Sequence, residues 1–173
     1  DYRGAIADFN KAIEINPQHA TAYYSRGLAK NRSKDYQGAL ADYSKAIAIN
    51  PQLAIAYNDR GIAKKNLGDI QGALADFNKA IAINPQYSRA YNNRGVAKGL
   101  SGNEQGMCLD LKKASLLGSD KATKGLNQFC QSNQAAHAQS AGDFINRGIA
   151  KGKSGDYKGA IVDFNKAIAI NPQ

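Results

Sequence analysis

Arginines and aspartates recur along the chain at matching positions. Each of four arginines stands directly before a glycine, and an aspartate follows it 16 residues later. A guanidinium group can bond a carboxylate through two parallel hydrogen bonds while its stem covers apolar surface. The pattern therefore predicts an ion pair inside each repeating unit, and the alternative is an arginine row that binds an acidic ligand. The predicted pairs are Arg26 with Asp42, Arg60 with Asp76, Arg94 with Asp110 and Arg147 with Asp163.

Residues that could support catalysis or bind a metal do not gather in the sequence. His19 and His137 stand alone, and there is neither a glycine-rich phosphate loop nor a nucleophile with a credible base. We therefore expect a non-catalytic protein that needs no cofactor. Cys108 and Cys130 lie on elements that should pack together, which predicts a disulfide in an oxidising compartment or, alternatively, two buried free thiols.

The elements that position these residues follow a fixed period. The motif Ile-Asn-Pro-Gln closes one unit at Pro17, the next at Pro51 and the third at Pro85, each 34 residues after the last. A period of this length is typical of a solenoid of helical hairpins. Within residues 54–87, apolar residues recur at helical spacing in two stretches, which the turn around Gly68 separates.

At these residues the sequence resembles the tetratricopeptide repeat (TPR) family. The family pattern has an aromatic residue and a glycine in helix A, then alanines around an aromatic residue in helix B, and a closing proline. Here those positions hold Tyr57, Gly61, Ala73, Phe77, Ala80 and Pro85. The resemblance implies an all-α fold, a right-handed α-solenoid of helix-turn-helix hairpins.

The repeat pattern divides the chain into consecutive segments. Because the chain opens inside a repeat, the sequence leaves the compartment open between a cytoplasmic and an exported protein. We expect a half repeat with helix B alone over 1–17, TPR hairpins over 20–53 and 54–87, a degenerate hairpin over 88–121, a closing helix over 122–130, a polar linker over 131–140 and a last hairpin over 141–173.

The resemblance also implies a binding surface, because in the family the A helices line a concave groove that holds an extended peptide. One subfamily grips the terminal carboxylate of chaperone peptides there, but Asp59 would repel that group, so chaperone-tail binding is not expected. Carried over by position, the groove residues are Tyr24, Leu28, Arg32, Asn58, Asp59, Ile62, Lys65, Asn66, Arg89, Asn92, Asn93 and Val96.

The net charge and the two end units of the repeat array suggest what the protein binds. With 23 basic and 14 acidic residues the net charge is +9, which favours a protein or peptide of acidic character. Nucleic acid is not expected, because the aromatic residues occupy core positions of the repeat, and no stretch predicts a membrane span. The leading hypothesis is a protein interaction scaffold. The alternative is a structural subunit that adds head to tail into an oligomer or filament, because the first and last units lack a cap.

Overall fold

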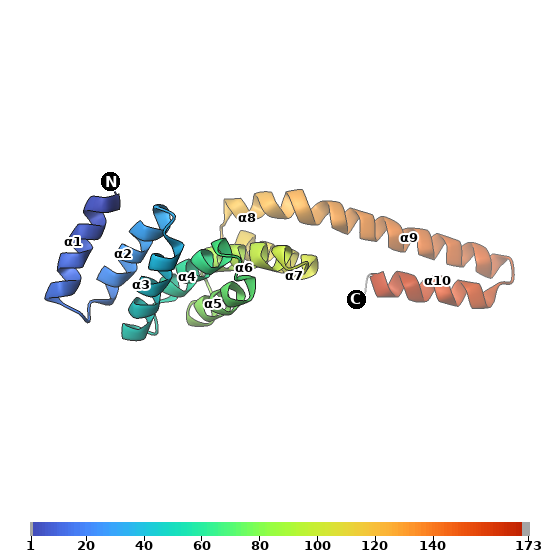
Figure 1. Cartoon of the computed structure of the whole chain (residues 1–173). Helices are drawn as coiled ribbons and strands as arrows, with labels where there is room; N and C mark the ends of the chain where they lie inside the picture. The colour runs from blue at the N-terminus through green and yellow to red at the C-terminus, as the bar shows by residue number, and fades with distance from the viewer. Residues whose placement is uncertain (1, 171–173) are drawn as a thin grey trace. The chain divides into compact units, whose positions relative to one another are not determined.

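The computed structural model describes residues 2–170, with the side chains of residues 131–140 outside that description. Every element of regular structure in this range is helical (Figure 1). The fold is the all-α solenoid expected from the repeat. The chain divides into two compact units, Asp1–Thr123 and Lys124–Gln173.

The first unit consists of helices of similar length that follow one another through short turns. They are α1 (Tyr2–Ile15), α2 (Ala20–Arg32), α3 (Tyr36–Ile49), α4 (Ala54–Asn66), α5 (Ile70–Ile83), α6 (Ser88–Leu100) and α7 (Glu104–Leu116). A short helix, α8 (Asp120–Gly125), begins in this unit and ends in the next.

Local chemistry explains where these helices begin and end. Asp69 caps α5, because its carboxylate accepts a hydrogen bond from the backbone N–H of Gly72 at 2.8 Å. Gly68, just before this cap, has φ +87°, a conformation that favours glycine. Pro85 follows the end of α5 and supplies no backbone N–H to extend it. The repeat therefore carries its own start and stop signals.

Small residues let the two helices of each hairpin pack closely. α2 packs on α3, α4 on α5 and α6 on α7. Gly61 on α4 faces Phe77 on α5 so closely that an added Cβ would lie 2.7 Å from the ring. Phe77 is fully buried, as is Ala73 one turn earlier. The core of this hairpin is therefore one large ring against glycine and alanine.

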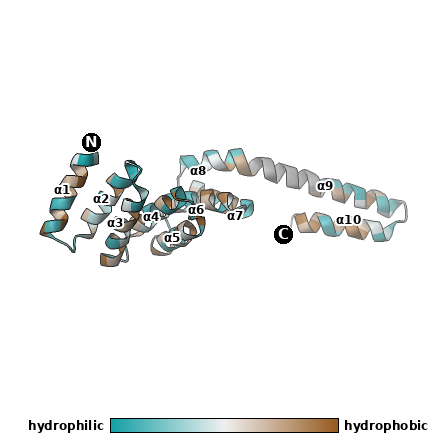
Figure 2. Cartoon of the chain, viewed as in Figure 1, coloured by the Kyte–Doolittle hydropathy of each residue, from teal (hydrophilic) through white to brown (hydrophobic). Residues whose placement is uncertain are grey.

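Consecutive hairpins also pack against one another and bury apolar side chains between them. α3 packs on α4, and α5 packs on α6. Ile47 near the end of α3 is 8% exposed and joins a cluster with Ala56 and Tyr57 of the following A helix. Figure 2 shows hydrophilic and hydrophobic residues on the same helices, as this packing requires. The hydrophobic core thus runs along the array.

The second unit differs from the expected segments at its start. The sequence predicts one closing helix over 122–130, whereas the structure has the end of α8 followed by a π-helical segment, Leu126–Cys130. Residues 131–140, expected to form a polar linker, are instead the first part of α9 (Gln131–Lys153). This stretch lacks an apolar stripe, but it contains neither glycine nor proline and is rich in alanine and glutamine, which favour a helix. α9 packs against α10 (Tyr157–Ile170).

Candidate ligand-binding face

The repeated arginines bind the aspartates of their own hairpins. In the central hairpin, Arg60 Nε donates to Asp76 Oδ2 at 2.9 Å, and its Nη2 donates to Oδ1 at 2.7 Å. Lys64 Nζ lies 2.9 Å from the same Oδ2. Because Asp76 is only 4% exposed, the two cations compensate a buried charge. The same arrangement holds in the other hairpins, as Arg26 and Lys30 on Asp42, Arg94 and Lys98 on Asp110, and Arg147 and Lys151 on Asp163.

The arginines also connect neighbouring repeats. Arg60 Nη1 donates to Ser44 Oγ at 3.1 Å, and Arg94 Nη1 donates to Asn78 Oδ1 at 2.7 Å, both on the preceding B helix. The guanidinium of Arg60 lies 5.5 Å from the centre of the Tyr57 ring. These contacts use the guanidinium groups inside the array, which favours a structural role for the arginine row over ligand binding.

The role of the lysines in completing these ion pairs was not predicted from the sequence. Their spacing of four residues after the arginine, as in Arg60 and Lys64, is the signal that could have found them, because it places both cations on one face of a helix. In the last hairpin, Arg147 and then Lys151 hold the pKa of Asp163 below its usual range by hydrogen bonding to the charged form.

The groove residues expected from the sequence belong to α2, α4 and α6, which together form the A-helix face. The structure exposes them to different degrees. Arg32, Asn66, Arg89 and Val96 are exposed, Tyr24, Leu28, Ile62, Lys65 and Asn93 are half-buried, and Asn58, Asp59 and Asn92 are buried. The buried three belong to the packing beneath the face, so they differ from the expectation that all twelve residues are available to a ligand.

A hydrogen-bonded network connects the three A helices beneath this face. Tyr24 Oη on α2 donates to Asp59 Oδ2 on α4 at 2.8 Å. Asn58 Nδ2 donates to Asp59 Oδ1 at 2.8 Å, and Asn93 Nδ2 on α6 donates to Asn58 Oδ1 at 2.9 Å. We call these four residues the Asp59 network. Since Asn58 is fully buried and Asp59 is 5% exposed, the network fixes the A helices relative to one another.

Electrostatic effects concentrate around Asp59. Burial raises the pKa of Asp59, while the hydrogen bonds from Tyr24 and Asn58 and the charges of Arg89 and Arg32 act to lower it. Burial, followed by the nearby Asp59 charge, raises the pKa of Tyr24. The same two causes raise the pKa of Tyr43 and Tyr87, neither of which was singled out as a site residue from the sequence.

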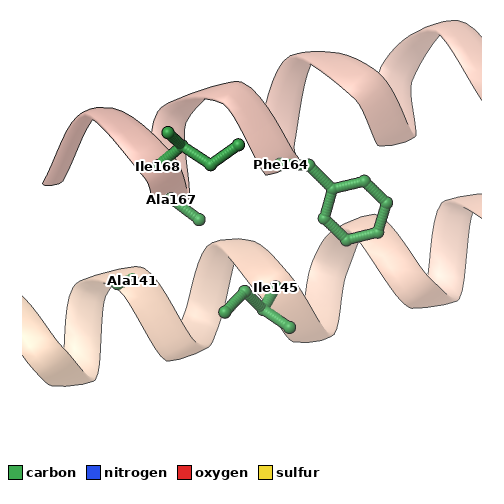
Figure 3. Close-up of a pocket in the computed structure, with 5 residues that line it drawn as sticks. All are labelled: Ala141, Ile145, Phe164, Ala167 and Ile168. Atoms are coloured by element: carbon green, nitrogen blue, oxygen red, sulfur yellow. The ribbon is translucent and has the colours of Figure 1, made fainter. Parts of the chain in front are cut away.

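The second unit has an apolar cleft between α9 and α10. It has a volume of about 280 Å³ and is formed by Ala141, Ile145, Phe164, Ala167 and Ile168 (Figure 3). Ile168 is 63% exposed, whereas Ile47 at the same repeat position is covered by the next A helix. The side chains around this cleft carry no acid, base or nucleophile, so their chemistry suits apolar contact.

Other features bear on the kind of site the chain holds. Over the described residues there is no group of three or more His, Cys, Asp and Glu that could hold a metal ion. Within the same range, no helix is both long enough and apolar enough to cross a membrane. Cys130 is buried and Cys108 half-buried, and the disulfide between them stays a prediction from the sequence.

Comparison with protein families identifies the repeat. Three family models match along the chain: a tetratricopeptide repeat model over residues 26–96, a TPR repeat model over 1–33 and another tetratricopeptide repeat model over 144–173. The chain belongs to the tetratricopeptide repeat family. No curated protein sequence matches this TPR chain.

Solved structures share the TPR fold. The first TPR of Spaghetti (RPAP3), bound to the HSP90 peptide SRMEEVD, is 25% identical, with a TM-score of 0.63, over 66% of this chain and 93% of that one. MamA has a TM-score of 0.65 at 19% identity, over 98% of this chain and 88% of that one. The Arabidopsis OM64 TPR domain has a TM-score of 0.63 at 24% identity, over 65% of this chain and 95% of that one. The last two support the fold alone.

Proposed function

We propose that this TPR chain is a non-catalytic protein interaction scaffold that binds an extended peptide or protein segment in the concave groove lined by its A helices. The observation that carries the proposal is a row of apolar side chains at one repeat position of α2, α4 and α6. Leu28 and Ile62 are half-buried there, and Val96 is 37% exposed. The peptide bound to the similar domain of Spaghetti supports a ligand of this kind.

Basic residues beside this row favour a partner with acidic character. Arg32 on α2 and Arg89 on α6 are exposed and both act electrostatically on Asp59, and Lys65 is half-buried on α4. The net charge of +9 acts in the same direction over longer distances. An extended segment that combines apolar and acidic side chains would therefore complement both the row and its surroundings.

The proposal can be tested with peptides selected from a random phage-displayed library on the immobilised protein. Introducing a negative charge with Val96→Glu should weaken binding of a selected peptide by about tenfold or more, because it disrupts the apolar row and repels acidic side chains. Arg89→Ala should weaken binding less and reduce its dependence on salt. Fluorescence anisotropy would measure the dissociation constants.

The matched control is Leu109→Glu, which also introduces a glutamate at an exposed apolar residue. Leu109 is 63% exposed on α7, away from the A-helix row. It should leave peptide binding unchanged. Equal losses for the two glutamate variants, or failure to select any peptide, would contradict the proposed groove.

Self-assembly is the alternative function, and the exposed apolar surface of α10 favours it. Ile161, Val162 and Ile168 are each more than half exposed there, at 59%, 51% and 63%. Light scattering after size exclusion across a concentration series is the test. Growth of the particle mass with concentration, abolished by Ile168→Glu, is the result expected for self-assembly, and a constant monomer mass would rule it out.

A further inference from the structure

The Asp59 network uses hydrogen-bond donors that would otherwise be available on the A-helix face. The hydroxyl of Tyr24 donates to Asp59, and one N–H of Asn58 donates to the other oxygen of the same carboxylate. An N–H of Asn93 is in turn directed to Asn58. Donors from α2 and α4 therefore meet on the Asp59 carboxylate, and the donor on α6 is held by Asn58. A ligand's own acceptor would have to compete with these internal acceptors.

The acceptor at the centre of the Asp59 network is a buried carboxylate that lies among hydrogen-bond donors and near positive charges. Burial raises the pKa of Asp59, whereas its two hydrogen bonds, which come from different side chains, and the charges of Arg89 and Arg32 favour its ionised form. Asp59 is 5% exposed, so water screens its charge less than it would screen an exposed carboxylate. A carboxylate thus lies beneath the middle helix of the A-helix face, and the two flanking helices, α2 and α6, each carry an exposed arginine.

A free C-terminus brought to this position would face a like charge. The peptide bound to the Spaghetti domain, SRMEEVD, ends in aspartate, so its last residue carries both an α-carboxylate and a side-chain carboxylate. Two carboxylates within about 4–6 Å disfavour one another's ionised form. An internal segment presents neutral backbone amides at the same place and can still bring acidic side chains to Arg32 or Arg89.

From these observations we infer that Asp59 is a specificity-determining residue, which makes the A-helix face discriminate against free C-terminal carboxylates and take an internal segment of its partner. The inference rests on the proposed groove. It assigns Asp59 an indirect role, since the residue is buried and acts through its charge and through the amides that it orients.

The test uses the peptide SRMEEVD, synthesised once as the free acid and once as the C-terminal amide, each with an N-terminal fluorophore. Anisotropy titrations compare the wild-type chain with Asp59→Asn, which is nearly isosteric and can still accept the Tyr24 hydrogen bond. The wild-type protein should show no preference for the acid. Asp59→Asn should bind the acid about tenfold more tightly than wild type does, which corresponds to one pKa unit of like-charge interaction, and should bind the amide unchanged.

A matched control and a second variant keep the result interpretable. Asp69→Asn removes the same charge from the exposed cap of α5, where asparagine is equally suitable because Asn103 caps α7 in the same way. It should behave like wild type. Asp59→Ser removes the central charge with a smaller side chain, and it should shift the preference in the same direction if Asp59→Asn does not fold, as judged by circular dichroism.

Three results would overturn the inference. The first is a wild-type protein that binds the free acid more tightly than the amide. The second is an unchanged ratio of acid to amide affinity in both Asp59 variants, which includes the case that neither variant binds the peptide. The third is an equal gain in affinity for the free acid in Asp69→Asn. None of these would decide against the proposed groove, because that proposal depends on peptides selected for the wild-type protein and on Val96→Glu.

Discussion

Replacing Phe77 by alanine is expected to lower the free energy of unfolding by about 3–5 kcal/mol, the range for removing a buried aromatic ring. The ring is fully buried and lies against Gly61, where an added Cβ would be 2.7 Å away. Glycine cannot fill the cavity that the substitution leaves. Urea unfolding followed by circular dichroism would measure the loss.

Phe164 provides the matched control for this prediction. It occupies the same position of the last hairpin and faces Gly148 in the same way, but it is 37% exposed. Phe164→Ala should therefore cost clearly less than Phe77→Ala, because part of that ring is already in water. Equal losses, or a loss below about 1 kcal/mol for Phe77→Ala, would show that burial in the array does not determine the contribution of this ring.

Removing the carboxylate of Asp76 is expected to have an effect of similar size. Asp76→Ala should cost about 3–5 kcal/mol, because it leaves two cations beside one another without their partner. The side chains of Arg60 and Lys64 are 18% and 21% exposed, so water compensates them only in part. The loss should persist at high salt, since a covered pair is screened less than an exposed one.

Two further variants separate this ion pair from a general effect of charge. Asp69→Asn, at the exposed cap of the same hairpin, should change the stability by no more than about 0.5 kcal/mol. The double variant Arg60→Met with Asp76→Leu should recover much of the loss, because apolar replacement of both partners removes the unpaired charge. If Asp76→Ala cost no more than about 1 kcal/mol, as for a lost helix cap, the buried pair would not be a major source of stability.

The groove could be predicted from sequence only as a set of positions. The family pattern places Asn58, Asp59 and Asn92 on helix A, but the structure buries them. Their exposure depends on side chains that lie far away in sequence, since Tyr24 and Asp59 are 35 residues apart, as are Asn58 and Asn93. The Asp59 network arises because these residue types stand at corresponding positions of different repeats, which no single repeat reveals.

The stretch 131–140 shows a second limit of predicting structure from the sequence. Its side chains lack the apolar periodicity that marks a helix packed on one face, and the sequence therefore suggested a linker. The structure continues α9 through it. Helix propensity and the lack of a helix breaker were the applicable signals there, because periodicity reports only on helices with a buried side.

The sequence by itself determined the repeated hairpin, because its signals are local. The period of 34 residues, the caps such as Asp69, the glycines of the turns and the closing prolines act within a few residues of where they stand. Tertiary structure alone decided which polar side chains are covered, that Tyr24 donates to Asp59 and that Asn93 donates to Asn58. These outcomes depend on distances between residues of different helices, and such distances exist only once the hairpins have packed.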